Sequence, residues 1–388
     1  MIKHILTLAW NKKRNNVLML LEIFLAFLIL FAVFSFTIYY LRIFRSPLGF
    51  SSAHTLTVQM PYDVATDSLA RLELRQTLRR EVAAYPEVES VSLLSGITPF
   101  SGSMWSWSND DNGFYLQTAI YPADTEYQRT AGIELLAGRW FEEADYTATY
   151  PPVIINQRLV DEYFGDRPVL DSVINLQGEK KVVGIAKHFK YRSEFEEEIP
   201  ITFLLRPLHE SDFNNLQIKL RPGTPPDFEA KLNEDLARIA KTRDFMIGSL
   251  DARRQRVSRR TWIPMIAALS ICGFLVVNIA LGLFGVLFYG INRRRAEIGL
   301  RRALGATKAE ITRQFTLEVF AVALVAMLLG TLLAVQFPLL EVVDIPAENF
   351  YWAILATLLL ISLVVLACAV LPSRQAAGIH PAAALHEE

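Results

Sequence analysis

Four long apolar runs limit what this chain can fold into more than any other feature. They cover residues 17–41, 262–291, 315–337 and 351–371. A helix needs about 20 consecutive apolar residues to cross the hydrocarbon core of a bilayer. The first run is about twice as long as the apolar part of a secretory signal peptide and has no small-residue cleavage site after it. We therefore predict four transmembrane helices, the first of them uncleaved.

The long interval between the first and second runs, residues 42–260, has the pattern of a folded α+β domain. Two strand–helix–strand patterns occur in it, at 55–60, 66–84 and 88–94, and again at 216–220, 227–241 and 245–250. We predict that they pair into one sheet with helices on one face, which forms a βαβ lobe from 50–95 and 214–251. The insertion at 96–213 would then form a second lobe.

Composition agrees with membrane helices joined to a water-soluble domain. The mean hydropathy of the 388 residues is +0.26, yet 20% of them are charged. Cys272 and Cys368 both lie in apolar runs, so the large domain has no disulfide and depends on its core. The net charge of −1 gives no reason to expect a nucleic-acid partner.

Charge also indicates the topology. The segment 292–314, which we call the basic segment, contains Arg293, Arg294, Arg295, Arg301, Arg302, Lys308 and Arg313. Basic residues beside a membrane span mark the cytoplasmic side. The loop 338–350 is acidic and has no Lys or Arg, which fits the outer side. We predict an inner-membrane protein with a cytoplasmic amphipathic helix at 1–16, a cytoplasmic tail at 372–388 and both termini inside.

The basic segment has the pattern of a helix that breaks and restarts. Glu297 lies four residues before Arg301, a favourable helical pair. Gly305 is a helix stop, and Thr307 with Glu310 forms a capping box for the next helix. A single apolar face is predicted from the helical spacing of Leu300, Ala303, Leu304 and Ile311. Such a helix would present a rigid face to a cytoplasmic partner.

Three stretches carry a resemblance to a known family. Residues 294–307, which read R-x-x-E-I-G-L-R-R-A-L-G-A-T, closely resemble the coupling-helix region of MacB-type ABC transporter permeases. Residues 132–141, GIELLAGRWF, and 152–156, PVIIN, are similar to the periplasmic core domains of that family. The end of the chain, from Leu371 to Leu385, resembles the family's C-terminal pattern, although His386 stands where an Arg is usual.

The resemblance implies a dimer of four-span subunits, made with a second copy or a paralogue, in which each subunit binds a separate ABC ATPase. The coupling residues it implies are Glu297, Ile298, Arg301, Gly305 and Ala306. Motion driven by ATP would pass through the spans to the periplasmic domain and export a substrate from the periplasm. A periplasmic adaptor and an outer-membrane channel would be further partners.

The chain lacks the patterns of catalysis and cofactor binding. No G-x-x-x-x-G-K-[ST] sequence occurs, so we expect ATP on the partner and no cofactor on this chain. The histidines lack metal-ligand spacing, and no hydrolase motif is present. We therefore expect a non-catalytic subunit without metal, cofactor or catalytic residues. The acidic run Glu196, Glu197 and Glu198 is expected to be a solvated surface.

Other functions and contacts stay open at this point. A LolC-like subunit would extract lipoproteins, and an FtsX-like protein would regulate a cell-wall hydrolase without transporting anything. Trp105 and Trp107 lie among Ser, Gly and Asn in 101–113, where they could contact a periplasmic partner or substrate or pack against the domain. The arginines of 253–260, just before the second span, are expected to face lipid phosphates or water.

Overall fold

The computed structural model describes residues 13–61, 67–111, 114–206 and 214–377. It divides into two compact units. The core domain comprises Ile43–Thr261, and the membrane unit comprises the residues up to Arg42 and from Trp262 onward. Residues 1–12 of the predicted amphipathic helix and 378–388 of the predicted tail lie outside the described ranges.

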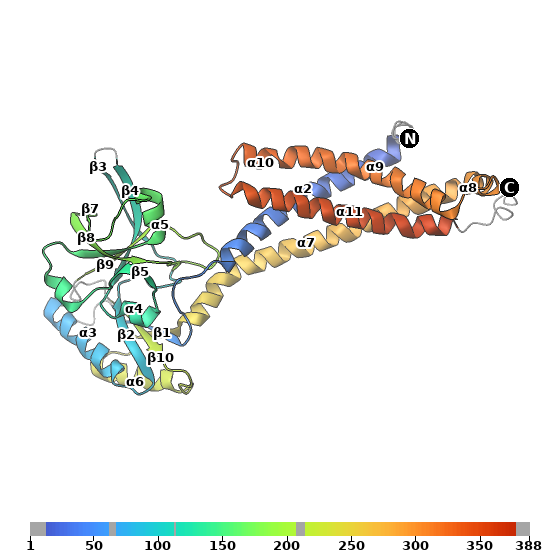
Figure 1. The fold of residues 1–388 in the computed structure, drawn as a ribbon. Coiled ribbons are helices and arrows are strands. Elements are labelled where there is room, and N and C mark those ends of the chain that lie inside the picture. The colour runs from blue at the N-terminus through green and yellow to red at the C-terminus, as the bar shows by residue number, and fades with distance from the viewer. Residues whose placement is uncertain (1–12, 62–66, 112–113, 207–213, 378–388) are drawn as a thin grey trace. The chain divides into compact units, whose positions relative to one another are not determined.

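The membrane unit is built from the helices α2 (Lys13–Arg45), α7 (Leu250–Arg293), α8 (Arg295–Ala303), α9 (Lys308–Ala334), α10 (Gln336–Leu339) and α11 (Ala347–Ala377). Four of them, α2, α7, α9 and α11, are long and apolar enough to cross a membrane. The helices α9 and α11 pack against each other along much of their length (Figure 1). The prediction of four transmembrane helices, with a large domain between the first and the second, is confirmed.

The core domain contains one sheet of 11 strands. The strands are β1 (Thr55–Gln59), β2 (Val88–Leu94), β3 (Trp105–Asp111), β4 (Phe114–Ala123), β5 (Leu135–Gly138), β6 (Pro152–Asn156), β7 (Val173–Asn175), β8 (Glu179–Ala186), β9 (Ile201–Leu205), β10 (Asn215–Leu220) and β11 (Met246–Ser249). Their order is β11-β1-β10-β2-β4-β9-β6-β8-β5, with β3 beside β4 and β7 beside β8.

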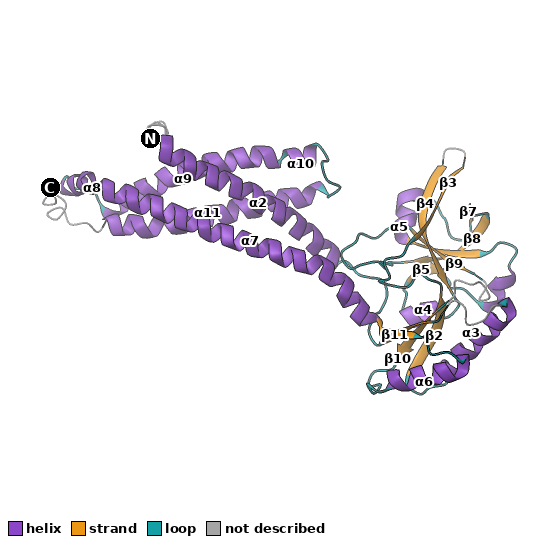
Figure 2. Cartoon of the chain, turned by 180° about the vertical axis from the view of Figure 1, so that it is seen from behind, coloured by secondary structure: helices purple, strands orange, loops and turns teal. Residues whose placement is uncertain are grey.

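The helices of the core domain are α3 (Ser68–Ala83), α4 (Tyr127–Ala131), α5 (Gln157–Leu159), α6 (Phe228–Ala240), a 3-10 turn at Glu143–Thr147 and a π turn at Val160–Phe164. Strands β1, β2, β10 and β11, which we call the first half of the sheet, pair antiparallel. The helices α3 and α6 cover one face of this half (Figure 2). Alternate apolar residues of the strands point to that face, and the helices bury them, as their spacing requires.

Strands β3 to β9 form the inserted half, which continues the same sheet rather than forming a separate one. The two halves meet where β2 and β4 pair, and Leu94 opposite Ala123 is the only register pair there. Asp124 follows immediately, and its carboxylate accepts hydrogen bonds from the backbone N–H of Leu93 (2.7 Å) and of Glu126 (3.1 Å). This buried carboxylate therefore ties the end of β2 to the start of α4.

Asp124 should make the stability of the core domain depend on pH. Burial raises the pKa of Asp124 to about 7, although the two backbone N–H groups and Arg79, 3.7 Å away, oppose the shift. Because the folded-state pKa lies above the unfolded value, folding takes up a proton, and the associated stability is lost as pH rises from about 4 to about 7. Asp124→Asn should remove this dependence. Thermal unfolding of the purified chain between pH 5 and 8 tests it, and equal pH slopes in the two proteins would contradict it.

The start of α7 belongs to the core domain. Nη1 of Arg253 donates to Oγ1 of Thr98 (2.7 Å), and Nη1 of Arg254 donates to Oγ of Ser52 (3.1 Å). The expectation that these two arginines face lipid phosphates or water was therefore wrong. The helix begins at Leu250, within the domain, so its first turns are held by domain side chains.

Candidate functional site

The helix α8 occupies the centre of the basic segment, between the end of α7 and the start of α9. It ends at Ala303, and the turn that follows contains Gly305, whose φ of 99° is the left-handed conformation that glycine adopts most easily. The backbone N–H of Ala306 donates to the carbonyl of Arg301 (3.0 Å) across this turn. The helix break predicted at Gly305 is thus present in the structure.

The helix α9 begins with the predicted capping box. Oγ1 of Thr307 accepts a hydrogen bond from the backbone N–H of Glu310 (3.3 Å), and the carboxylate of Glu310 accepts one from the backbone N–H of Thr307 (2.8 Å). These two bonds satisfy N–H groups that have no partner within a helix. The cap fixes the direction in which the chain leaves the turn at Gly305.

An apolar cluster holds α8 against its neighbours. Its buried members are Ile291, Ile298, Ile311 and Phe315, and Ala306 packs beside them. Ile298 is only 2% exposed, so its side chain positions α8 and is not available to a partner. The backbone N–H of Ala306 also makes the hydrogen bond to Arg301 that closes the turn at Gly305. Of the five predicted coupling residues, these two therefore have a clear packing role.

The predicted apolar face was partly wrong. Ile311 is buried as expected, but Leu300 is 53% exposed and Leu304 79% exposed, and Ala303 is exposed as well. The left-handed turn at Gly305 separates α8 from α9, so helical spacing cannot be continued from Leu304 to Ile311. Leu300, Ala303 and Leu304, which we call the exposed face of α8, remain without a covering element in the described chain.

A polar network joins α8 to α9 and to the end of α7. Nη2 of Arg301 lies 2.5 Å from Oε1 of Glu297, and Nη1 of Arg301 donates to Oε1 of Gln314 (2.7 Å). Nε2 of Gln314 donates to Oε1 of Glu318 (3.2 Å), and Nη1 of Arg294 lies 2.9 Å from Oε2 of Glu318. Any displacement of α8 must therefore break this chain of bonds or move α9.

The two ion pairs of the network differ in burial. The side chains of Arg294 and Glu318 are 16% and 20% exposed, and the guanidinium of Arg294 also lies over the ring of Phe315. The side chains of Arg301 and Glu297 are 45% and 49% exposed. The inner pair is therefore shielded within the junction, whereas the outer pair remains accessible on α8.

Gln314 and Glu318 were not among the residues predicted from the sequence. Their spacing of four residues on one helix face was the available signal, but their partners come from other helices. Among the residues that the structure describes, no group of three His, Cys, Asp or Glu side chains is arranged to hold a metal ion.

The two predicted tryptophans lie on the β3–β4 hairpin of the core domain. Trp107 packs against the apolar cluster beneath β6 and β8, which gives it a structural role. Trp105 is 39% exposed, and its neighbour Met104 is exposed too. Trp105 is thus the better candidate of the two for a contact with a partner or substrate.

Comparison with known proteins gives matches along nearly the whole chain. The sequence model described as the MacB-like periplasmic core domain matches residues 17–234. The model described as the FtsX-like permease C-terminal matches residues 269–381. The second match includes α8, α9 and α11, and the first includes most of the core domain.

Individual relatives give the same picture. The "Macrolide export ATP-binding/permease protein MacB" of Neisseria meningitidis is 24% identical over 309 residues, which are 76% of this chain and 47% of that protein. The protein "MacB 1/2" of the same description from Paracoccus denitrificans is 29% identical over 224 residues, 55% of this chain and 33% of its own length. The chain thus spans about half or less of these curated relatives.

A solved structure, the periplasmic region of MacB from Actinobacillus actinomycetemcomitans, matches with a TM-score of 0.38 and 14% identity over 56% of this chain and 98% of that one. The family assignment depends on the sequence models, of which the core-domain model alone matches more than half of the chain. The chain therefore belongs to the MacB/FtsX-like family of ABC transporter permeases.

Proposed function

We propose that this chain is a permease subunit that transmits the ATP-driven motion of a separate ABC ATPase to its periplasmic core domain. In this proposal α8 and both termini are cytoplasmic, and two permease subunits, identical or paralogous, form a dimer. The observation that carries the proposal is the exposed face of α8. Leu300 lies on this short helix and Leu304 in the turn that follows it, and their position is fixed by the apolar cluster and by the capping box of α9.

A partner groove is the occupant that best fits this face. Covering the exposed apolar side chains of a helix with a partner is favourable, because it removes their surface from water. The outer ion pair of Glu297 and Arg301 lies on the same helix and would contribute orientation. The lipid interface could also cover two leucines, so the test has to distinguish a protein partner from lipid.

The polar network supports transmission of motion from α8. A push on α8 acts on Arg301, which is bonded to Gln314 of α9, and Gln314 is bonded to Glu318. The pair of Arg294 and Glu318 connects the same site to the end of α7. Two spanning helices would therefore respond together, as a two-state mechanical element requires.

Export from the periplasm is the activity that we propose, because the relatives are described as macrolide exporters. Affinity purification of the intact protein in mild detergent tests the partners. An ATPase recovered with a periplasmic adaptor supports export through an outer-membrane channel. An ATPase recovered with a cell-wall hydrolase favours regulation, one recovered with lipoproteins favours extraction, and recovery of no ATPase contradicts the proposal.

Gly305→Val should separate assembly from coupling. Apart from its chain neighbours, no atom of the described residues lies within 4 Å of the position that a Cβ would take. The valine is therefore strained by the left-handed backbone, at a cost of about 1–3 kcal/mol. We expect the variant to insert and to retain its ATPase, but to lose the ATP-dependent change in protease sensitivity of the core domain. Gly305→Asn is the control, because asparagine tolerates this conformation. A wild-type response in Gly305→Val would contradict the proposed transmission of motion through α8.

A further inference from the structure

The segment 187–200, which connects β8 to β9 and which we call the strap, contains no strand or helix. It nevertheless has several charged side chains with little exposure, among them Lys190, Glu194 and Glu198. A connecting loop is normally solvated, and burial of a charged group is costly unless the group is fully paired. The contacts of these side chains show what the strap holds together.

Lys190 holds the end of α2. Its Nζ donates to the carbonyl of Ile43 (2.9 Å), to Oγ of Ser46 (2.9 Å) and to the carbonyl of Glu194 (3.1 Å). Its backbone N–H donates to the carbonyl of Leu48 (2.8 Å). Burial lowers the pKa of Lys190, while neighbouring carboxylates oppose that shift. All three ammonium donors are thus used, and two of them bind the chain where α2 ends.

An aromatic contact and a close approach reinforce this attachment. The ring of Phe195 in the strap stacks on Phe44 of α2, with centroids 5.2 Å apart. At Gly49 the backbone passes so close to the strap that a Cβ would lie 1.9 Å from the carbonyl oxygen of His188. The end of α2 and the loop that follows it are therefore packed directly on the strap.

Glu194 holds the start of α7. Its buried carboxylate accepts a hydrogen bond from Oγ of Ser258 (2.6 Å) and pairs with Nη2 of Arg254. The other terminal nitrogen of Arg254 donates to Oγ of Ser52 (3.1 Å), and that hydroxyl donates to Oδ1 of Asp251 (2.6 Å). The strap carboxylate thus holds Ser258 and Arg254 of α7 directly, and Arg254 extends the network to Ser52 and Asp251.

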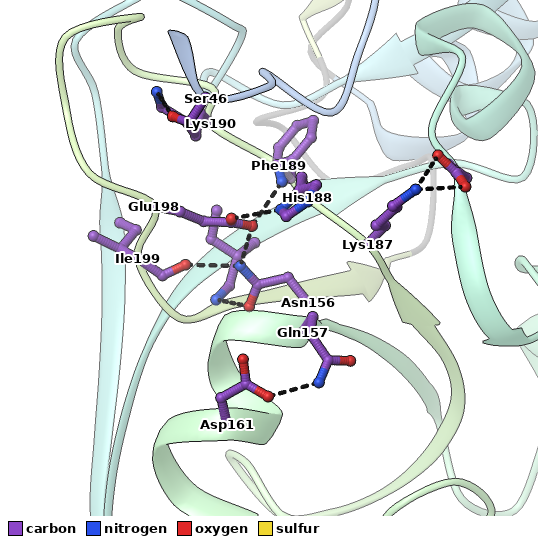
Figure 3. Close-up of polar contacts among 12 residues, drawn as sticks. Ser46, Asn156, Gln157, Asp161, Lys187, His188, Phe189, Lys190, Glu198 and Ile199 are labelled. Atoms are coloured by element: carbon purple, nitrogen blue, oxygen red, sulfur yellow. Dashed lines mark hydrogen bonds and ion pairs between the residues drawn. The ribbon is translucent and has the colours of Figure 1, made fainter. Parts of the chain in front are cut away.

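The two ends of the strap are anchored in the inserted half of the sheet. Figure 3 shows Glu198 at the centre of one anchor, where its carboxylate accepts from the backbone N–H of Phe189 (3.0 Å) and from Nδ2 of Asn156 (3.2 Å) and contacts Nδ1 of His188 (2.9 Å). The rings of Phe189 and Tyr191 enter the aromatic core of this half and stack on each other. The expectation that Glu198 is simply solvated was therefore wrong.

We infer that the strap is the joint that fastens the end of α2 and the start of α7 to the inserted half, with Lys190 and Glu194 as its positioning residues. Apolar side chains could fill the same space without the cost of burying two charges. Directed hydrogen bonds instead fix where each helix end lies. The mechanical role of the joint rests on the proposed function, but the joint itself can be tested without an ATPase.

The test measures how rigidly α7 is held in the full chain. Spin labels are placed at two exposed positions of the core domain, Arg259→Cys on α7 and Glu179→Cys on β8, after Cys272 and Cys368 are replaced by alanine. We expect a narrow distance distribution in the parent protein and a broad one in Glu194→Gln. The backbone amide at position 190 should also exchange its hydrogen about tenfold faster in Lys190→Met than in the parent protein.

Glu196→Gln is the matched control, because within the described residues the carboxylate of Glu196 pairs with Arg192 alone, on the more exposed side of the strap. A distance distribution equally narrow in Glu194→Gln and Glu196→Gln would contradict the proposal that the strap is a joint, whatever the protein transports. With a copurified ATPase, Glu194→Gln should also lose the ATP-driven change in the label distance. If the distribution broadens but the parent shows no ATP-driven change, the joint stands and the proposed function fails.

Discussion

Gly138→Ala is expected to lower the free energy of unfolding of the core domain by about 3–5 kcal/mol, because overpacking and a left-handed backbone act together. Gly138 ends β5 with a φ of 76°. A Cβ there would lie 2.2 Å from the carbonyl oxygen of Val183 and 2.8 Å from Cα of Gly184. Both are backbone atoms of the paired strand β8, so they cannot move aside without loss of the strand pairing.

Gly178→Ala is the control for this prediction. Gly178 also has a positive φ, 101°, but apart from its chain neighbours no described atom lies within 4 Å of its Cβ position. We therefore expect a cost of about 1–2 kcal/mol from the backbone conformation alone. Urea unfolding of the detergent-purified chain, followed by the fluorescence of buried residues such as Trp140, measures both values. Similar losses in the two variants would show that close packing at β5 contributes little.

The sequence predicted the features that depend on neighbours along the chain. Apolar runs of sufficient length predicted the four spans, and periodicity predicted the strands and helices of the first half. The capping box of Thr307 and Glu310 was predicted for the same reason, since the two residues are three positions apart. The GIELLAGRWF stretch was identified only by resemblance, and the structure supplies the reason for its Gly138.

Contacts between distant residues could not be predicted in this way. Lys190 and Ile43 are 147 positions apart, and Glu194 and Arg254 are 60 apart. In the sequence the strap is a polar stretch without periodicity, which is typical of a solvated loop. The exposed face of α8 was misassigned for a related reason, because helical spacing was continued through a glycine that ends the helix.

Arg294→Met is expected to reduce stability the more strongly of two variants, whereas Glu297→Gln is expected to reduce partner binding the more strongly. Arg294→Met leaves the carboxylate of Glu318 shielded and without its guanidinium partner. Loss of one partner of a buried pair costs about 3–5 kcal/mol, and the partial exposure of this pair reduces the cost to about 2 kcal/mol. Glu297→Gln disrupts only the outer pair, so its effect on stability should stay within about 1 kcal/mol.

If α8 enters a groove on the ATPase, Glu297→Gln should weaken partner binding more than Arg294→Met does. Glu297→Gln, and more strongly Leu304→Asp, should reduce the amount of ATPase that copurifies, although both variants melt close to the parent protein. Arg294→Met combined with Glu318→Gln should regain most of the stability lost in Arg294→Met alone, because no uncompensated charge then remains. Melting curves and copurification on the same preparations give both readouts. If Leu304→Asp keeps its ATPase, the exposed face of α8 does not form the docking surface, and lipid becomes its occupant.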